Sequence, residues 1–69
     1  MEQQLSARNQ LAGTITSITL GAVMAEVVVD VNGTEVVAAI TRTSAESMGL
    51  KEGDRVRAVI KATEVMIAR

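Results

Sequence analysis

Apolar and polar residues alternate along much of this chain, and the alternation is clearest between Val23 and Val31. The odd positions there are all apolar: Val23, Ala25, Val27, Val29 and Val31. The acidic residues Glu26 and Asp30 fall on even positions. Because successive side chains of a strand point to opposite faces, this period of two predicts a strand with one face in a core.

The dipeptide Asn32-Gly33 comes directly after this strand. It is the strongest short hairpin signal, since both central positions of the favoured two-residue turn need a positive φ. The return strand is predicted over Thr34–Thr41, and both of its faces carry apolar side chains: Val36, Ala38 and Ile40 on one, Val37 and Ala39 on the other. Two apolar faces in so short a chain predict that one side of this strand meets another subunit.

Residues 11–20 are rich in Thr and Ile and predict a first strand, with Gly13 near its start. Its apolar phase shifts between Ile15 and Ile18. A β-bulge near Thr16 or Ser17 would account for this shift, because one extra residue exchanges the two faces.

One short helix is predicted after the third strand. Thr43 or Ser44 is the expected N-cap, Glu46 is expected in the first turn, and Met48 is expected to face inward. Gly49 is expected to end the helix in a left-handed conformation.

Two further strands are predicted, over residues 54–61 and over residues 65–68. In the first of these, Arg55 and Arg57 are expected to be outward charges or partners of Glu26 and Asp30. Five strands with one short helix between the third and the fourth is the element order of an OB-type barrel. The predicted fold class is therefore mainly β, an OB-like five-stranded barrel.

The composition favours a binding protein that associates with further copies of itself. The 69 residues suffice for one domain, of which 48% are apolar and none is aromatic, so the core must be aliphatic. Large exposed apolar patches are rare on soluble monomers. Oligomerisation is therefore the expected way to cover the aliphatic surface that so small a domain cannot bury. Without Cys and His, disulfides and the usual zinc and copper sites are excluded, and no residue is expected to ligate a metal cation directly.

The net charge and the first residues of the chain limit the kinds of partner that are expected. A net charge of −1 gives no broad positive field for nucleic acid. The start, Met1-Glu2-Gln3-Gln4, is polar and acidic, unlike a signal peptide, and no apolar run approaches the ~20 residues of a membrane span. A cytoplasmic protein without a membrane partner is expected.

Two stretches carry the candidate chemistry, namely Ser6-Ala7-Arg8-Asn9-Gln10-Leu11 and Lys61-Ala62-Thr63-Glu64. The first offers a guanidinium, a hydroxyl, an amide and backbone N–H groups, and the second adds an ammonium. A dianion leaves water only where positive charge and several donors replace its hydration shell. Together the stretches predict an anion site for a compact oxyanion.

Several separately spaced motifs resemble a molybdate-binding Mop domain of the kind that occurs alone in the small molbindins. They are S-A-R-N-Q-L-A-G, A-E-V-V-V-D-V-N-G-T-E-V, G-L-K-E-G-D and A-V-I-K-A-T-E-V-M-I-A, in this order. On this resemblance residues 1–69 form a single Mop domain with an OB fold. The resemblance also implies a homo-oligomer, expected as a hexamer built as a trimer of dimers, with oxyanion sites at the subunit interfaces.

The same resemblance assigns the anion site to two copies of the chain. The residues implied are Ser6, Ala7 and Arg8 of one copy, with Lys61 and Ala62 of the partner. Position 62 departs from the version of the motif that carries serine, and the lost hydroxyl is expected to weaken or retune binding by roughly 1 kcal/mol. Asn9 is a further candidate, and it is expected to fix the loop more than to touch the ligand.

The expected ligand is molybdate or tungstate, since both are unprotonated dianions that suit a site made only of donors. Storage or buffering of the oxyanion is the predicted function. Without a histidine base or a cysteine nucleophile, an enzyme is not expected. Two alternatives remain: a nucleic-acid-binding OB module, although the aromatic residues on which bases stack are missing, and a purely structural assembly subunit.

Overall fold

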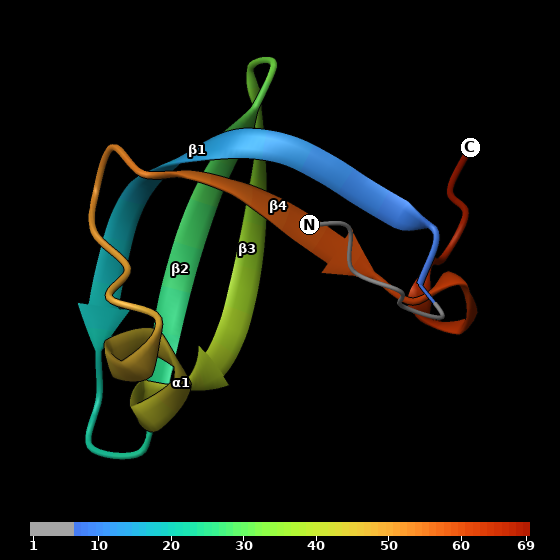
Figure 1. The fold of residues 1–69 in the computed structure, drawn as a ribbon. Helices are drawn as coiled ribbons and strands as arrows, with labels where there is room; N and C mark the ends of the chain where they lie inside the picture. The colour runs from blue at the N-terminus through green and yellow to red at the C-terminus, as the bar shows by residue number, and fades with distance from the viewer. Residues whose placement is uncertain (1–6) are drawn as a thin grey trace.

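The computed structural model describes residues 7–69, and residues 1–6 lie outside the described part. Four antiparallel strands form one sheet in the order β3-β2-β1-β4 (Figure 1). The elements in chain order are β1 (Asn9–Leu20), β2 (Met24–Val31), β3 (Thr34–Thr41), α1 (Arg42–Ser47), β4 (Arg55–Ile60) and the 3-10 helix η1 (Ala62–Glu64). The mainly β class and the helix between the third and fourth strands are as expected.

Strand β1 is shared between two neighbours and contains the predicted bulge. Its first half pairs with β4, and its second half pairs with β2. The register shifts between Ile15 and Ser17, which leaves Thr16 as the extra residue. The bulge returns Ile18 to the inner face, where it packs against the core around Ile15.

The first half of β1 passes very close to the end of β2 at Gly13. A Cβ on Gly13 would collide with the carbonyl oxygen of Asp30 and lie 2.7 Å from Cγ1 of Val29. Only a residue without a side chain fits there, so this glycine sets how sharply the sheet can coil.

The β2–β3 hairpin is formed as predicted. Asn32 and Gly33 have φ of 51° and 90°, the two positive values that a type I′ turn requires. Ala25, Val27 and Val29 of β2 are buried, and the inner residues of β3 pack beside them. Val23 was expected to open β2 but precedes it, because a turn bond from Gly21 N–H to the Met24 carbonyl leaves it 71% exposed.

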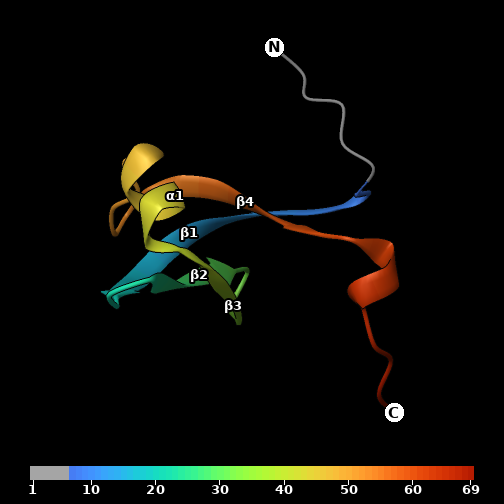
Figure 2. The ribbon, with the colours of Figure 1, turned by 90° about the horizontal axis from the view of Figure 1, so that it is seen from below.

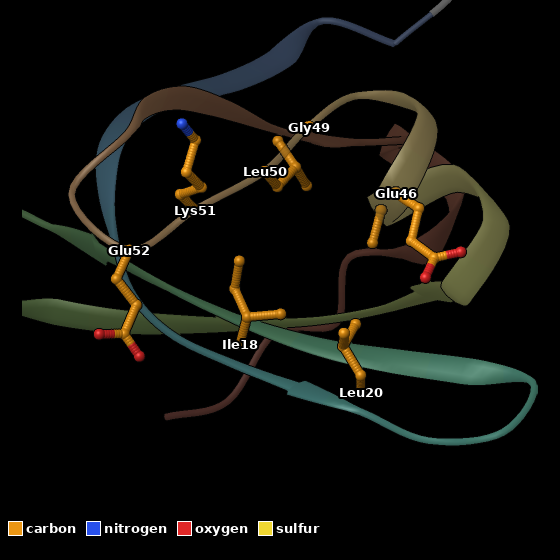
Figure 3. A pocket seen from close by; sticks show the side chains of 8 residues that line it. Ile18, Leu20, Glu46, Gly49, Leu50, Lys51 and Glu52 are labelled. Atoms are coloured by element: carbon orange, nitrogen blue, oxygen red, sulfur yellow. The ribbon is translucent and has the colours of Figure 1, made fainter.

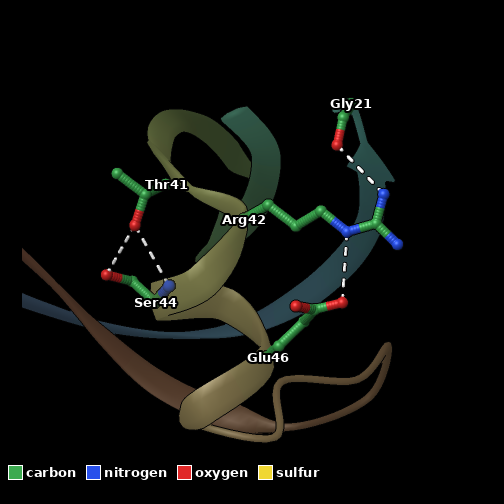
Figure 4. Close-up of polar contacts among 5 residues, drawn as sticks. All are labelled: Gly21, Thr41, Arg42, Ser44 and Glu46. Carbon is green, nitrogen blue, oxygen red and sulfur yellow. Dashed lines mark hydrogen bonds and ion pairs between the residues drawn. The ribbon is translucent and has the colours of Figure 1, made fainter. Parts of the chain in front are cut away.

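Helix α1 begins earlier than the sequence predicted. Thr41, the last residue of β3, is the N-cap, and its hydroxyl accepts a hydrogen bond from Ser44 N–H at 3.0 Å (Figure 4). The prediction of Thr43 or Ser44 was wrong because Thr41 already has the extended backbone that an N-cap needs. Glu46 therefore lies outside the first turn.

The buried residue of α1 is Ala45, whereas Met48 is 60% exposed, so the expected inward methionine was also wrong. Gly49 does follow the helix with φ of 63°. Arg42 fastens the helix to the β1–β2 loop, since its guanidinium donates to Glu46 and to the Gly21 carbonyl (Figure 4).

The predicted fifth strand, over residues 65–68, is not formed within this chain, and the sheet is open instead of closed into a barrel. After η1 the chain runs away from the sheet and meets no strand edge with which it could pair (Figures 1 and 2). Met66 and Ile67 are each 91% exposed.

The first half of β1 and all of β4 project from the rest of the molecule as a two-stranded ladder, which we call the arm (Figures 1 and 2). Helix η1 and the C-terminal residues lie at its far end. The core is at the other end, around Ile15, Val27 and Val29. The far end of the arm therefore lies away from the core.

Candidate functional site

The two stretches that carry the predicted anion site meet at the far end of the arm. The last paired residues of the ladder are Asn9 and Ile60. Extending this antiparallel register by one pair brings Arg8 opposite Lys61, although they are 53 positions apart in the sequence (61 − 8). Both side chains are exposed. The fold therefore places the two predicted cationic residues at the same end of the arm.

The carbonyl of Ala7, the residue before Arg8, is held by the side chain of Gln10. The Nε2 of Gln10 donates to the Ala7 carbonyl at 3.2 Å, and its Oε1 accepts from Nη1 of Arg57 at 2.6 Å. Asn9, the first residue of β1, stays a prediction for fixing this loop, and Gln10 supplies a hydrogen bond there. Sequence reasoning missed Gln10, because only the cross-strand contact with Arg57 distinguishes it from an ordinary polar residue.

Lys61 and Ala62 form the turn that ends β4. Lys61 is extended, with φ −65° and ψ 135°, and its carbonyl accepts from Glu64 N–H at 2.8 Å. The N–H groups of Ala62 and Thr63 precede this first helical donor, so they belong to the initial N–H groups of a helix that have no intrahelical partner. An ammonium and backbone donors are thus close in sequence at the end of the arm.

The ion pair found within residues 7–69 does not involve Arg8 or Lys61, the two cationic residues of the predicted anion site. Between residues 7 and 69 the one ion pair joins Arg42 to Glu46, on α1 and away from the arm. Arg8 and Lys61 therefore keep their positive charge available for a ligand. Ser6, which was expected to add a hydroxyl, lies outside the described residues.

One chain supplies only one side of such a site. Arg8, Lys61 and Ala62 are all exposed, and Ala7 is half-buried. A dianion held only by these residues would remain largely in water, where a charge pair at 4 Å is worth about 1 kcal/mol. A second surface is needed to exclude water and to strengthen the contacts.

A groove of about 430 Å³ lies between α1, the segment after it and the end of β1. Its floor is apolar, with Ile18, Leu20 and Leu50, and its rim carries Glu46, Lys51 and Glu52 (Figure 3). Two carboxylates against one ammonium make this groove unfavourable for an oxyanion.

A second cavity, of about 220 Å³, opens on the inner face of the sheet and is lined mainly by core residues such as Ile15, Val29 and Ile40. It lies where the sheet fails to close. Among residues 7–69, no group of three or more acidic side chains is placed to hold a metal ion. None of the described helices is long and apolar enough to cross a membrane.

Comparison with known proteins assigns the family. The family model of the TOBE domain matches residues 5–67, nearly the whole chain. Molybdenum-pterin-binding protein 3 of Clostridium pasteurianum is 47% identical over 64 residues, covering 91% of this chain and 94% of that protein. The chain belongs to the TOBE domain family, as a domain of the Mop type.

Solved structures agree with this TOBE assignment. A molybdate-binding protein from Sporomusa ovata superposes with a TM-score of 0.93 at 45% identity, covering 97% of this chain and all (100%) of that one. The cytoplasmic molybdate-binding protein ModG, solved with molybdate bound, gives a TM-score of 0.82 at 46% identity, covering 87% of this chain and 43% of ModG. The resemblance to Mop domains drawn from the sequence motifs is thereby confirmed.

Proposed function

We propose that this TOBE domain binds molybdate or tungstate between copies of itself and serves as an intracellular store or buffer of the oxyanion. The observation that carries the proposal is that the β1–β4 ladder ends at the pair Asn9–Ile60, so that Arg8 and Lys61 both lie at the same end of the arm. Similar proteins support molybdate as the ligand, because one is named a molybdenum-pterin-binding protein and another was solved with molybdate bound. Residues 1–69 act as one Mop domain that binds and does not catalyse.

The chemistry of the site suits a tetrahedral dianion. Arg8 and Lys61 together neutralise two negative charges, and backbone N–H groups of Ala7 and Ala62 add uncharged donors. Molybdate and tungstate present only acceptor oxygens at neutral pH, so each donor can be used. Ser6 adds a hydroxyl in the proposal, and Ala62 offers no hydroxyl where the related motif has serine.

Association of copies follows from the apolar residues of the arm and the tail. Five of them are substantially exposed: Leu11, Val59, Val65, Met66 and Ile67. Burying such a side chain fully is worth roughly 1.5–3 kcal/mol. A homo-oligomer, proposed as a hexamer built as a trimer of dimers, would cover them and supply the partner's Lys61 and Ala62 to each site.

The same association would complete the five-stranded OB barrel. The sheet has free edges at β3 and β4, and the cavity of about 220 Å³ lies on its inner face. We propose that residues 65–68 of a neighbouring copy pair with one of these free edges, beside the cavity, as the fifth strand. Their apolar side chains fit a cavity lined mainly by Val, Ile, Leu and Ala.

Nucleic acid and membranes have no part in the proposal. The net charge is −1, and the chain lacks the aromatic side chains on which bases stack. A cytoplasmic location is proposed, and it is supported by the similar protein ModG, which is described as cytoplasmic.

Titration calorimetry with molybdate, with sulfate as the comparison anion, tests this function. Saturable heat with molybdate and a weaker response to sulfate are expected. If an assembled oligomer gave no heat with molybdate, the chain would instead be a structural assembly subunit.

A further inference from the structure

A second cluster of positive charge lies on the outer face of β4, away from the residues of the anion site. Arg55 and Arg57 are two positions apart on this edge strand, so both point to the same face, and both are exposed. They were expected to be outward charges or partners of Glu26 and Asp30. They are outward, but their recorded hydrogen bonds go to neutral side chains of β1 instead of to these acids.

The two arginines lean apart along the strand and leave a hollow between them. Arg55 donates straight across the ladder to the hydroxyl of its register partner Thr14, at 3.1 Å. Arg57 is paired with Ala12 but donates diagonally to Gln10, at 2.6 Å. The small side chain of Ala12 therefore remains uncovered. The resulting arginine notch has a volume of about 270 Å³ and is lined by Ala12, Arg55, Val56 and Arg57.

The charge of the notch is not cancelled within the described part of the chain. The acceptors on Thr14 and Gln10 are neutral, and the ion pair recorded among residues 7–69 involves neither arginine. A guanidinium has five N–H donors, and each arginine has one recorded hydrogen bond. Two full positive charges with spare donors thus flank an open hollow.

The nearest acids on this face by strand register do not line the notch. Asp30 is paired with Thr14, and Glu35 is paired with Asp30. Asp30 and Arg55 are thus separated by two strand spacings, about 9–10 Å. Arg55 donates to Thr14, and the ion pair found among residues 7–69 involves neither Asp30 nor Glu35.

We propose that the arginine notch is a second anion-binding site, which takes small tetrahedral dianions and is complete within one chain. Arginine presents planar pairs of N–H donors that match two oxygens of such an ion. The notch has no hydrogen-bond acceptor that would distinguish a protonated anion from an unprotonated one. It also has no enclosing wall that would select anions by size. It therefore binds phosphate, sulfate and molybdate with similar affinity, unlike a site enclosed between copies.

The test uses the full chain with Arg8→Ala and Lys61→Ala, so that the first site is removed and a failure here leaves the proposed function untouched. This protein, labelled with ¹⁵N, is titrated separately with phosphate, sulfate and molybdate while the Arg Nε–H signals are followed by NMR. The signals of Arg55 and Arg57 should shift saturably with all three anions, with dissociation constants within about threefold of one another. Higher salt should weaken the binding, since the site is exposed.

Two variants of this Arg8→Ala, Lys61→Ala protein test whether the anion binds in the notch. Arg55→Gln with Arg57→Gln should raise the dissociation constants at least tenfold. Ala12→Glu keeps both arginines but places a carboxylate between them, and it should have the same effect, read from the arginine signals. Lys51→Gln is the matched control, because it removes one positive charge near α1. It should leave the three dissociation constants unchanged. The proposal is overturned by non-saturable shifts in the parent, by selectivity for one of the three anions, or by undiminished binding in either notch variant.

Discussion

Arg57 reaches past its register partner to donate to Oε1 of Gln10, at 2.6 Å, which leaves Nε2 of the same amide to donate to the Ala7 carbonyl. The residue before Arg8 is thereby tied to β4 through two hydrogen bonds in series. A binding loop needs such support, because a donor held in place loses less entropy when the anion arrives. The conformation of Arg8 is thus coupled to an arginine on the other strand of the arm.

Gln10→Ala tests this coupling. The variant should fold and assemble but bind molybdate more weakly, by up to about tenfold, since each lost hydrogen bond is worth roughly 0.5–1.5 kcal/mol. Calorimetry gives the affinity, and Thr19→Ala, an exposed change at the other end of β1, is the control. Equal affinities for both variants would mean that the amide does not support the site.

Arg8→Ala combined with Lys61→Ala should abolish the high-affinity binding of molybdate while the assembly persists. Both residues are exposed at the end of the arm and contribute charge and donors more than packing. Calorimetry should lose the high-affinity, molybdate-selective heat and keep at most the unselective binding of the arginine notch, and native mass spectrometry should report the same oligomer as for the parent. Unchanged titration heats in the double variant would refute the assignment of these two residues.

Saturating molybdate should raise the melting temperature of the parent protein. A ligand at about a thousand times its dissociation constant adds ~4 kcal/mol per site to the free energy of unfolding. In a domain of this size ~1 kcal/mol corresponds to roughly 4–8 °C. Differential scanning calorimetry with and without molybdate measures the shift, and the Arg8→Ala, Lys61→Ala variant should show little of it.

Much of the fold could be predicted from local pattern. The Asn32-Gly33 turn, the bulge at Thr16 and the left-handed Gly49 were all found where the sequence indicated. Each is a property of a few neighbouring residues, so the sequence nearby determines it. The N-cap was misplaced because Thr41, Thr43 and Ser44 all have a suitable hydroxyl, and only the path of β3 decides among them.

Long-range features were less predictable. The tail after η1 has the composition of a strand but finds no partner within its own chain, because strand pairing depends on what lies alongside. The contribution of Gln10 depends on a contact with a residue 47 positions away. The arginine notch likewise arises from the register between β1 and β4, which no periodicity in the sequence reveals.

Gly13→Ala should destabilise the protein more than the addition of a single methyl group would suggest. The new Cβ would meet the Asp30 carbonyl and lie 2.7 Å from Val29 Cγ1, and the backbone group cannot move without disturbing β2. Overpacking of this kind costs typically 1–3 kcal/mol. Chemical denaturation measures the loss, and Ala12→Ser, at the exposed neighbouring position, should stay within about 0.5 kcal/mol of the parent. A Gly13→Ala variant as stable as the parent would mean that β1 and β2 separate easily.

The tail provides the sharpest test of assembly. Met66 and Ile67 are each 91% exposed in one chain, and the proposal buries them in a neighbouring copy. Met66→Glu with Ile67→Glu would place two carboxylates in that apolar interface, where an unpaired charge costs several kcal/mol. The variant should dissociate in native mass spectrometry and lose the high-affinity binding of molybdate with the oligomer. Val23→Glu is the control, because Val23 is 71% exposed in the β1–β2 loop, away from the arm. If the double variant kept the parent's oligomeric state, the tail would have no part in joining the copies.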